Sequence, residues 1–144
     1  MDKRLNRVKL FYTALTFIGK DASPLDEAPD DFGCADSVSK IILNAFPCII
    51  KGSVSTKELN KQLSSSKDFI KVTSFKPGDI IMSPTGMGTT GKIPNGHVGI
   101  VSEDEEIMSN SSATGLWTQN YTLVSWVAKY RTLGGYPIYF YRKV

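Results

Sequence analysis

The spacing of hydrophobic residues changes partway along the chain. In the first 65 residues it follows the helical period, and three helices are predicted. The first covers most of residues 4–18, the second runs from near Cys34 to about Phe46, and the third lies within 53–63. Pro47 is expected to stop the second helix. Ser55 stands three residues before Glu58, which is the spacing of a capping box at a helix start.

Beyond residue 68 the period is that of short strands. Strands are predicted within 68–75, 78–83 and 97–103, with two further candidates at 106–112 and 114–120 and a closing strand within 136–144. A segment at helical spacing, 123–131, interrupts this series. Helices followed by an antiparallel sheet describe an α+β fold, and a length of 144 residues fits one domain covering 1–144.

The N-terminal segment has a basic start and then an apolar stretch, which raises the possibility of a signal peptide. Tyr12, Thr13 and Thr16 interrupt the apolar run, and no small-residue cleavage site follows cleanly. An amphipathic helix packed on the core is the better interpretation. Because the run is also too short to span a membrane, we expect a soluble protein.

The net charge of +3 conceals a separation of charge along the chain. Residues 21–36 hold six acidic residues and no Lys or Arg, so the remainder carries 17 basic and 8 acidic residues, a formal +9. One interpretation is a solvated acidic loop on an ordinary surface. The other is a mostly basic body suited to a polyanion such as nucleic acid or a bacterial wall. Since no nucleic-acid-binding motif occurs, nucleic acid is not expected as a partner.

Two cysteines and one histidine are the candidates for chemistry. Two cysteines are too few for a disulfide framework, and the absence of a C-x-x-C pair gives a cysteine zinc site little support. Cys34 is predicted in the first turn of a helix, where backbone N–H groups and the helix dipole stabilise a thiolate, although a buried filler is the alternative. Cys48, in the apolar run FPCII, fits the filler description better. His97 is expected to open a strand, and it could be structural or catalytic.

Three segments together resemble a known family. They are GCADSV (33–38), FKPGDIIMS (75–83) and NGHVGIVSEDEEIMSNSSATG (95–115), in that order. They resemble the papain-like cysteine hydrolases of the NlpC and CHAP type, which cut bacterial peptidoglycan. The resemblance implies a papain-like fold, with N-terminal helices packed on a small antiparallel sheet. It also implies Cys34 as nucleophile and His97 as base, with no metal or cofactor.

The chain departs from the family pattern at two places. Gly33 precedes the cysteine, where many relatives have aspartate or glutamine, and no second histidine is present for the third catalytic position. Asn110 fits that position if the SEDEE turn is one residue longer than usual, and Ser109 fits it otherwise. Asn110 is favoured, because an amide carbonyl is a stronger and longer-reaching partner for the imidazole than a hydroxyl.

Substrate contacts are predicted on both sides of the histidine. The glycine-rich loop 85–96 ends at His97 and could cover a peptide or gate entry, which makes Gly96 a candidate substrate contact. Trp117 is predicted to pack on a peptide or sugar. Trp126, at helical spacing with Leu123 and Tyr130, is predicted to be a core residue.

The predicted function is hydrolysis of an amide bond in peptidoglycan, as an endopeptidase or an N-acetylmuramoyl-L-alanine amidase. Compactness and the lack of an obvious signal favour a bacteriophage lysin (endolysin), located in the virion or the host cytoplasm before it acts on the wall. The alternative is a catalytically inactive wall-binding or virion structural module on the same scaffold.

Overall fold

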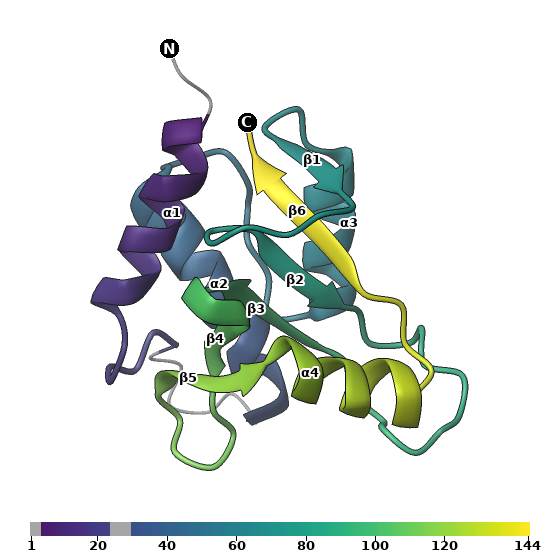
Figure 1. Ribbon diagram of the computed structural model, residues 1–144. Helices are drawn as coiled ribbons and strands as arrows, with labels where there is room; N and C mark the ends of the chain where they lie inside the picture. The colour runs from purple at the N-terminus through teal and green to yellow at the C-terminus, as the bar shows by residue number, and fades with distance from the viewer. Residues whose placement is uncertain (1–3, 24–29) are drawn as a thin grey trace.

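The computed structural model describes residues 4–23 and 30–144, and it contains helices and one sheet (Figure 1). Three helices come first: α1 (Arg4–Thr16), α2 (Asp30–Ala45) and α3 (Thr56–Ser65). The strands are β1 (Phe69–Val72), β2 (Ile80–Ser83), β3 (His97–Val101), β4 (Glu106–Asn110), β5 (Trp117–Thr122) and β6 (Tyr139–Lys143). A short 3-10 turn, η1 (Glu103–Glu105), joins β3 to β4. A helical segment made of α4 (Leu123–Trp126) and the π-helical η2 (Val127–Leu133) follows β5.

The strands form one antiparallel sheet in the order β1-β6-β2-β3-β4-β5. Each neighbouring pair is antiparallel, and the C-terminal strand β6 lies between β1 and β2. The α+β fold with N-terminal helices on an antiparallel sheet is therefore confirmed.

The two faces of the sheet have separate hydrophobic cores. Alternation along β3 and β4 sends Val98, Ile100 and Met108 to one face, where they pack with α1, α2 and α3. Val101 and Ile107 point to the other face and pack with Trp126 and other residues of the α4–η2 segment. Trp126 has no exposed surface, which confirms its prediction as a core residue.

The helices begin and end for local reasons, and one start differs from its prediction. Ser55 caps α3, because its Oγ accepts a hydrogen bond of 3.2 Å from the backbone N–H of Glu58. Helix α2 begins at Asp30, one turn before the predicted start near Cys34. Aspartate is favoured in a first turn because it faces the positive end of the helix dipole. Cys34 therefore opens the second turn of α2.

Helix α1 packs on the core through its middle residues. Leu10, Phe11 and Ala14 are buried, whereas Ile18 lies beyond the end of the helix and is exposed. Within 4–23 and 30–144, no helix is both long and apolar enough to cross a membrane.

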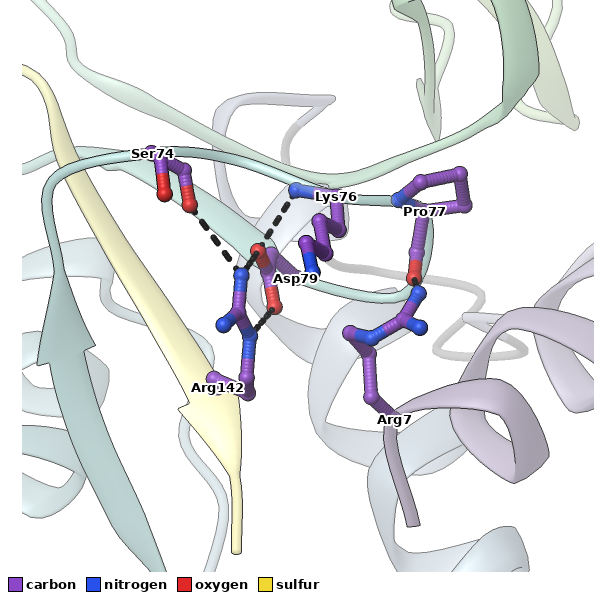
Figure 2. Close-up of polar contacts among 6 residues, drawn as sticks. All are labelled: Arg7, Ser74, Lys76, Pro77, Asp79 and Arg142. Carbon is purple, nitrogen blue, oxygen red and sulfur yellow. Dashed lines mark hydrogen bonds and ion pairs between the residues drawn. The ribbon is translucent and has the colours of Figure 1, made fainter. Parts of the chain in front are cut away.

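A buried carboxylate joins the middle strands to the turn before β2 (Figure 2). Asp79 has no exposed side-chain surface, and it accepts hydrogen bonds from the backbone N–H of Lys76 at 2.7 Å and from Arg142 Nε and Nη2 at 2.8 and 2.7 Å. These hydrogen bonds raise the pKa of Arg142. Arg142 Nη2 also donates to the carbonyl of Ser74 at 3.1 Å.

Helix α1 meets the same turn. Arg7 donates to the carbonyl of Pro77, and a Cβ at Gly78 would lie 2.1 Å from the carbonyl oxygen of Arg7. Gly78 also has φ +94°, a backbone region that other residues rarely adopt. Glycine at this position therefore permits both the turn and the close approach of α1.

Replacement of Asp79 by alanine is expected to destabilise the protein by about 3–5 kcal/mol, because it leaves the Arg142 guanidinium without its counter-ion. Urea unfolding would measure the change. Asp68→Ala is the matched control, since the Asp68 carboxylate is 46% exposed and 3.9 Å from Lys143 Nζ. Such a pair contributes less than about 1 kcal/mol. Equal losses in the two variants would contradict the role given to Asp79.

Candidate active site

Cys34 and His97 line the same pocket, which has a volume of about 540 Å³. The pocket lies at the end of the sheet where β3 begins and β4 ends. Cys34 comes from α2 and belongs to the core between the sheet and helices α1, α2 and α3. His97 packs against the α4–η2 segment on the other face of the sheet. The two layers of the fold thus meet around the first residue of β3.

The two cysteines have different surroundings. Cys34 is buried in the pocket wall, and the pKa of Tyr130 is raised mainly by burial, with a smaller contribution from Cys34. Cys48 is exposed, so the prediction that it fills the core is wrong. It follows the end of α2 with a positive φ of 69°, in a turn that directs the side chain away from the core. Neither cysteine forms a disulfide.

His97 is held by a hydrogen bond to the neighbouring strand. Its Nε2 lies 2.9 Å from Ser109 Oγ, and that hydroxyl donates to Asn120 Oδ1 at 2.5 Å. Because the hydroxyl has only one proton, Ser109 must accept from Nε2–H. This tautomer leaves the Nδ1 lone pair available to take a proton.

The register of β4 explains why Ser109 contacts the histidine. Ile100 pairs with Met108 and Val101 with Ile107, so continued pairing brings Ser109 to the face of His97. The turn between β3 and β4 therefore has the usual length, the alternative that brings Ser109 to the histidine, and not the length with one more residue that favours Asn110. Asn120, absent from the sequence prediction, reaches Ser109 because the β4–β5 pairing is irregular between Ile107 and Ser109. No local sequence signal indicates such a bulge.

Aromatic rings surround the imidazole. The ring centroids of Trp126, Tyr121 and Tyr130 lie 5.1, 5.5 and 5.9 Å from that of His97. Burial among these rings, together with the positive charge of Lys129, lowers the pKa of His97 to about 3. His97 is therefore neutral near pH 7, which is the form that can accept a proton.

Asn110 lines the pocket on the side of α2. A Cβ at Gly33 would lie 2.6 Å from Asn110 Nδ2, so the glycine before Cys34 makes room for this amide. Asn110 is 5% exposed, and within the described part of the chain its Oδ1 has no hydrogen-bond partner. Alternation along β4 directs Asn110 away from the face of Ser109, which is the residue that contacts His97.

Gly96 lines the pocket and also fixes the start of β3. A Cβ there would lie 2.0 Å from the carbonyl oxygen of Ser83 and 2.5 Å from the backbone nitrogen of Thr85. The Gly96 N–H donates to Thr85 Oγ1 at 2.8 Å. Only glycine permits this approach, which places the residue before His97 against the end of β2.

The rest of loop 85–96 is tied to the end of η2. Thr90 Oγ1 donates to the carbonyl of Leu133 at 2.8 Å, and Tyr136 donates its hydroxyl proton to the carbonyl of Ile93 at 2.7 Å. Ile93, Pro94 and Asn95 then form one wall of the pocket. In this structure the loop that was predicted to cover a peptide is hydrogen-bonded to the segment at the end of η2 and forms one wall of the pocket.

Trp117 does not occupy the position predicted for it. Its side chain is fully buried in the core under α1, and Nε1 donates to the carbonyl of Ala14 at 3.1 Å. Its backbone pairs with Lys20 and Gly19, which draws the start of β5 against the end of α1. The prediction that Trp117 packs on a substrate is therefore corrected, and its role is in the core.

Other pocket residues were not predicted from the sequence. Tyr121, Lys129 and Tyr130 line the side formed by β5 and η2. The spacing of hydrophobic residues predicted a helical segment at 123–131, but it did not indicate which polar residue of that segment faces a site. Among the described residues, no group of three or more His, Cys, Asp or Glu side chains is placed to hold a metal ion.

Comparisons with known proteins gave one kind of match. No protein-family model matches the chain, and no curated protein matches it. A chain in the crystal structure of the type VI native effector–immunity complex Tae3–Tai3 from Ralstonia pickettii is similar, with a TM-score of 0.60 and 18% sequence identity. The match covers 96% of this chain and 98% of the other. It supports the papain-like α+β fold.

The lowered pKa of His97 predicts a specific loss of stability in acid. Between the usual value of 6.5 and about 3, the unfolded chain binds a proton at His97 that the folded protein excludes. The contribution of His97 to folding stability is therefore fully present above about pH 6.5, and it is lost as the pH falls toward about 3. In urea unfolding, wild type should lose more stability than His97→Gln between about pH 7 and pH 4.5. Parallel pH dependence in the two proteins would contradict the low pKa.

Proposed function

We propose that this protein is a cysteine hydrolase that cuts an amide bond in peptidoglycan. The observation that carries the proposal is the meeting of Cys34 and His97, from opposite layers of the fold, in one pocket. The Nε2–H of that histidine is bound to Ser109, so Nδ1 is available as the base. The nucleophile, the base and the orienting hydroxyl are the parts that a cysteine hydrolase requires.

The reaction runs in two halves. Cys34 gives its thiol proton to His97 Nδ1 while Sγ attacks the carbonyl carbon of the substrate amide. His97 then protonates the nitrogen as the C–N bond breaks, which leaves a thioester on Cys34 and releases the amine. In the second half, water gives a proton to His97 and attacks the thioester. The C–S bond breaks, the carboxylic acid leaves, and the proton returns to the thiolate.

In the empty site the imidazole of His97 is neutral near pH 7, and its Nδ1 can accept a proton. A histidine with a pKa of about 3 does not hold a standing positive charge near neutral pH. Burial raises the pKa of Tyr130, so its phenol stays protonated as well.

Peptidoglycan is proposed as the substrate on sequence grounds, and the fold is consistent with it. The support is the resemblance of the segments around Cys34, Asp79 and His97 to NlpC and CHAP hydrolases, together with the formal +9 outside 21–36. Endopeptidase and N-acetylmuramoyl-L-alanine amidase activity both fit the chemistry. The phage-lysin role stays a prediction, and the neighbour's description as part of a type VI effector–immunity complex adds an effector role as a second setting.

The nucleophile assignment predicts opposite results for the two cysteines. Cys34→Ala should abolish release of fragments from purified peptidoglycan, because no other thiol lies in the pocket among the described residues. Cys48→Ala should retain most of the activity, since Cys48 is exposed and outside the pocket. Mass spectrometry of the released fragments measures the activity and identifies the bond. Wall binding without fragment release by the wild type would favour the non-catalytic module.

The positioning role assigned to Ser109 predicts a graded loss. Ser109→Ala should lower kcat by about 10–100-fold, because His97 then samples the unproductive tautomer. Asn110→Ala should lower kcat less, since the hydrogen bond to His97 Nε2 comes from Ser109, and Asn110 lies against Gly33. The ¹⁵N chemical shifts of His97 should report Nε2–H in the wild type and a tautomer mixture in Ser109→Ala. An unchanged tautomer with lost activity would assign Ser109 a different role.

A further inference from the structure

The described lining of the pocket includes one basic side chain. Among the described residues that line it, Lys129 is the only Lys or Arg, and there is no Asp or Glu. The remaining lining is made of neutral polar, aromatic and small side chains around Cys34 and His97. A ligand in this pocket therefore meets a single positive charge with no acidic side chain of the described lining to balance it.

Lys129 is held at the pocket by aromatic side chains rather than by an acid. Its Nζ donates to the Tyr121 hydroxyl at 3.2 Å and lies 5.3 Å from the centroid of the Tyr130 ring. In the described part of the chain it forms no salt bridge, and it is exposed. Its ammonium group is thus fixed in place with capacity for an anion.

This position is unfavourable for the proposed reaction when the pocket is empty. Positive charge near the imidazole opposes the imidazolium that forms when His97 takes the thiol proton, and Lys129 does lower the pKa of His97. An anion bound to Lys129 would remove that penalty. The substrate that best fits the pocket is therefore one that supplies the anion itself.

We propose that Lys129 binds a carboxylate of the substrate and makes the enzyme selective for anionic peptides, in which the scissile amide lies near an unmodified carboxylate. The inference rests on the proposed function and gives it a substrate class. A second feature of the pocket points to a peptide as well. The buried Oδ1 of Asn110 lacks a partner among the described residues, and a peptide N–H supplies the donor that it needs.

The test compares two synthetic wall peptides that are identical except that one carries a carboxylate where the other carries a carboxamide. Wild type should have a kcat/KM about tenfold higher on the carboxylate peptide, as expected for a hydrogen bond between charged groups. Lys129→Gln should reduce this ratio to about one, and Lys129→Arg should keep most of it because the charge remains. Lys61→Gln, an exposed change on α3 outside the pocket, should leave the ratio unaltered.

Two results would overturn the inference. One is an equal preference, or a preference for the carboxamide, in the wild type. The other is a Lys129→Gln variant that loses activity on both peptides by the same factor, which would mean that Lys129 only supports the aromatic packing.

Binding measurements separate this inference from the proposed function. In a Cys34→Ala background, calorimetry should show tighter binding of the carboxylate peptide, and Lys129→Gln should remove the difference. If the wild type cleaves neither peptide but this binding difference is present, the hydrolase proposal fails and the anion site stands. If the wild type cleaves both peptides and no binding difference exists, the hydrolase proposal stands and the anion site fails.

Discussion

The buried carboxylate of Asp79 is the constraint on which the middle of the sheet depends. Its side chain binds Arg142 of β6 and the backbone of the turn before β2, while its own backbone carbonyl accepts from Val101 at the end of β3. Three adjacent strands are therefore aligned by one residue. His97 and Val101 are the two ends of β3. The contact of Val101 with Asp79 therefore helps to position His97, the proposed base, at the other end of the strand. A fully buried acid is retained here because each of its oxygens has a hydrogen-bond donor.

Much of the fold was predictable because it depends on local rules. The change of period marked where helices give way to strands, and the Ser55 cap began α3 as predicted. Cys34 and His97 could be picked out because each lies at the start of, or near the start of, an element with a recognisable pattern. Bringing them into one pocket needs only the order of the elements and the right sheet topology.

The parts that were not predictable depend on pairing between strands. The turn at η1 has two consecutive non-glycine residues with positive φ, Asp104 at 55° and Glu105 at 60°. Nothing in their identity indicates this conformation, yet it sets the register that brings Ser109 to the histidine. The bulge that brings Asn120 to Ser109 is likewise invisible in a period-two pattern. The burial of Trp117 follows from the docking of β5 on the end of α1, which is a contact between distant segments.

The origin of the site in two layers has a consequence for when the protein acquires its chemistry. Ribosomes make α2, which carries Cys34, before β3, which carries His97, and the aromatic residues that surround the imidazole come later still. A growing chain that has folded its first helices holds a thiol but no imidazole. Neither core contains both groups, so the docked helices and the finished sheet must come together before a proton can pass between them. The proposed hydrolase activity therefore requires a chain whose folding is nearly complete.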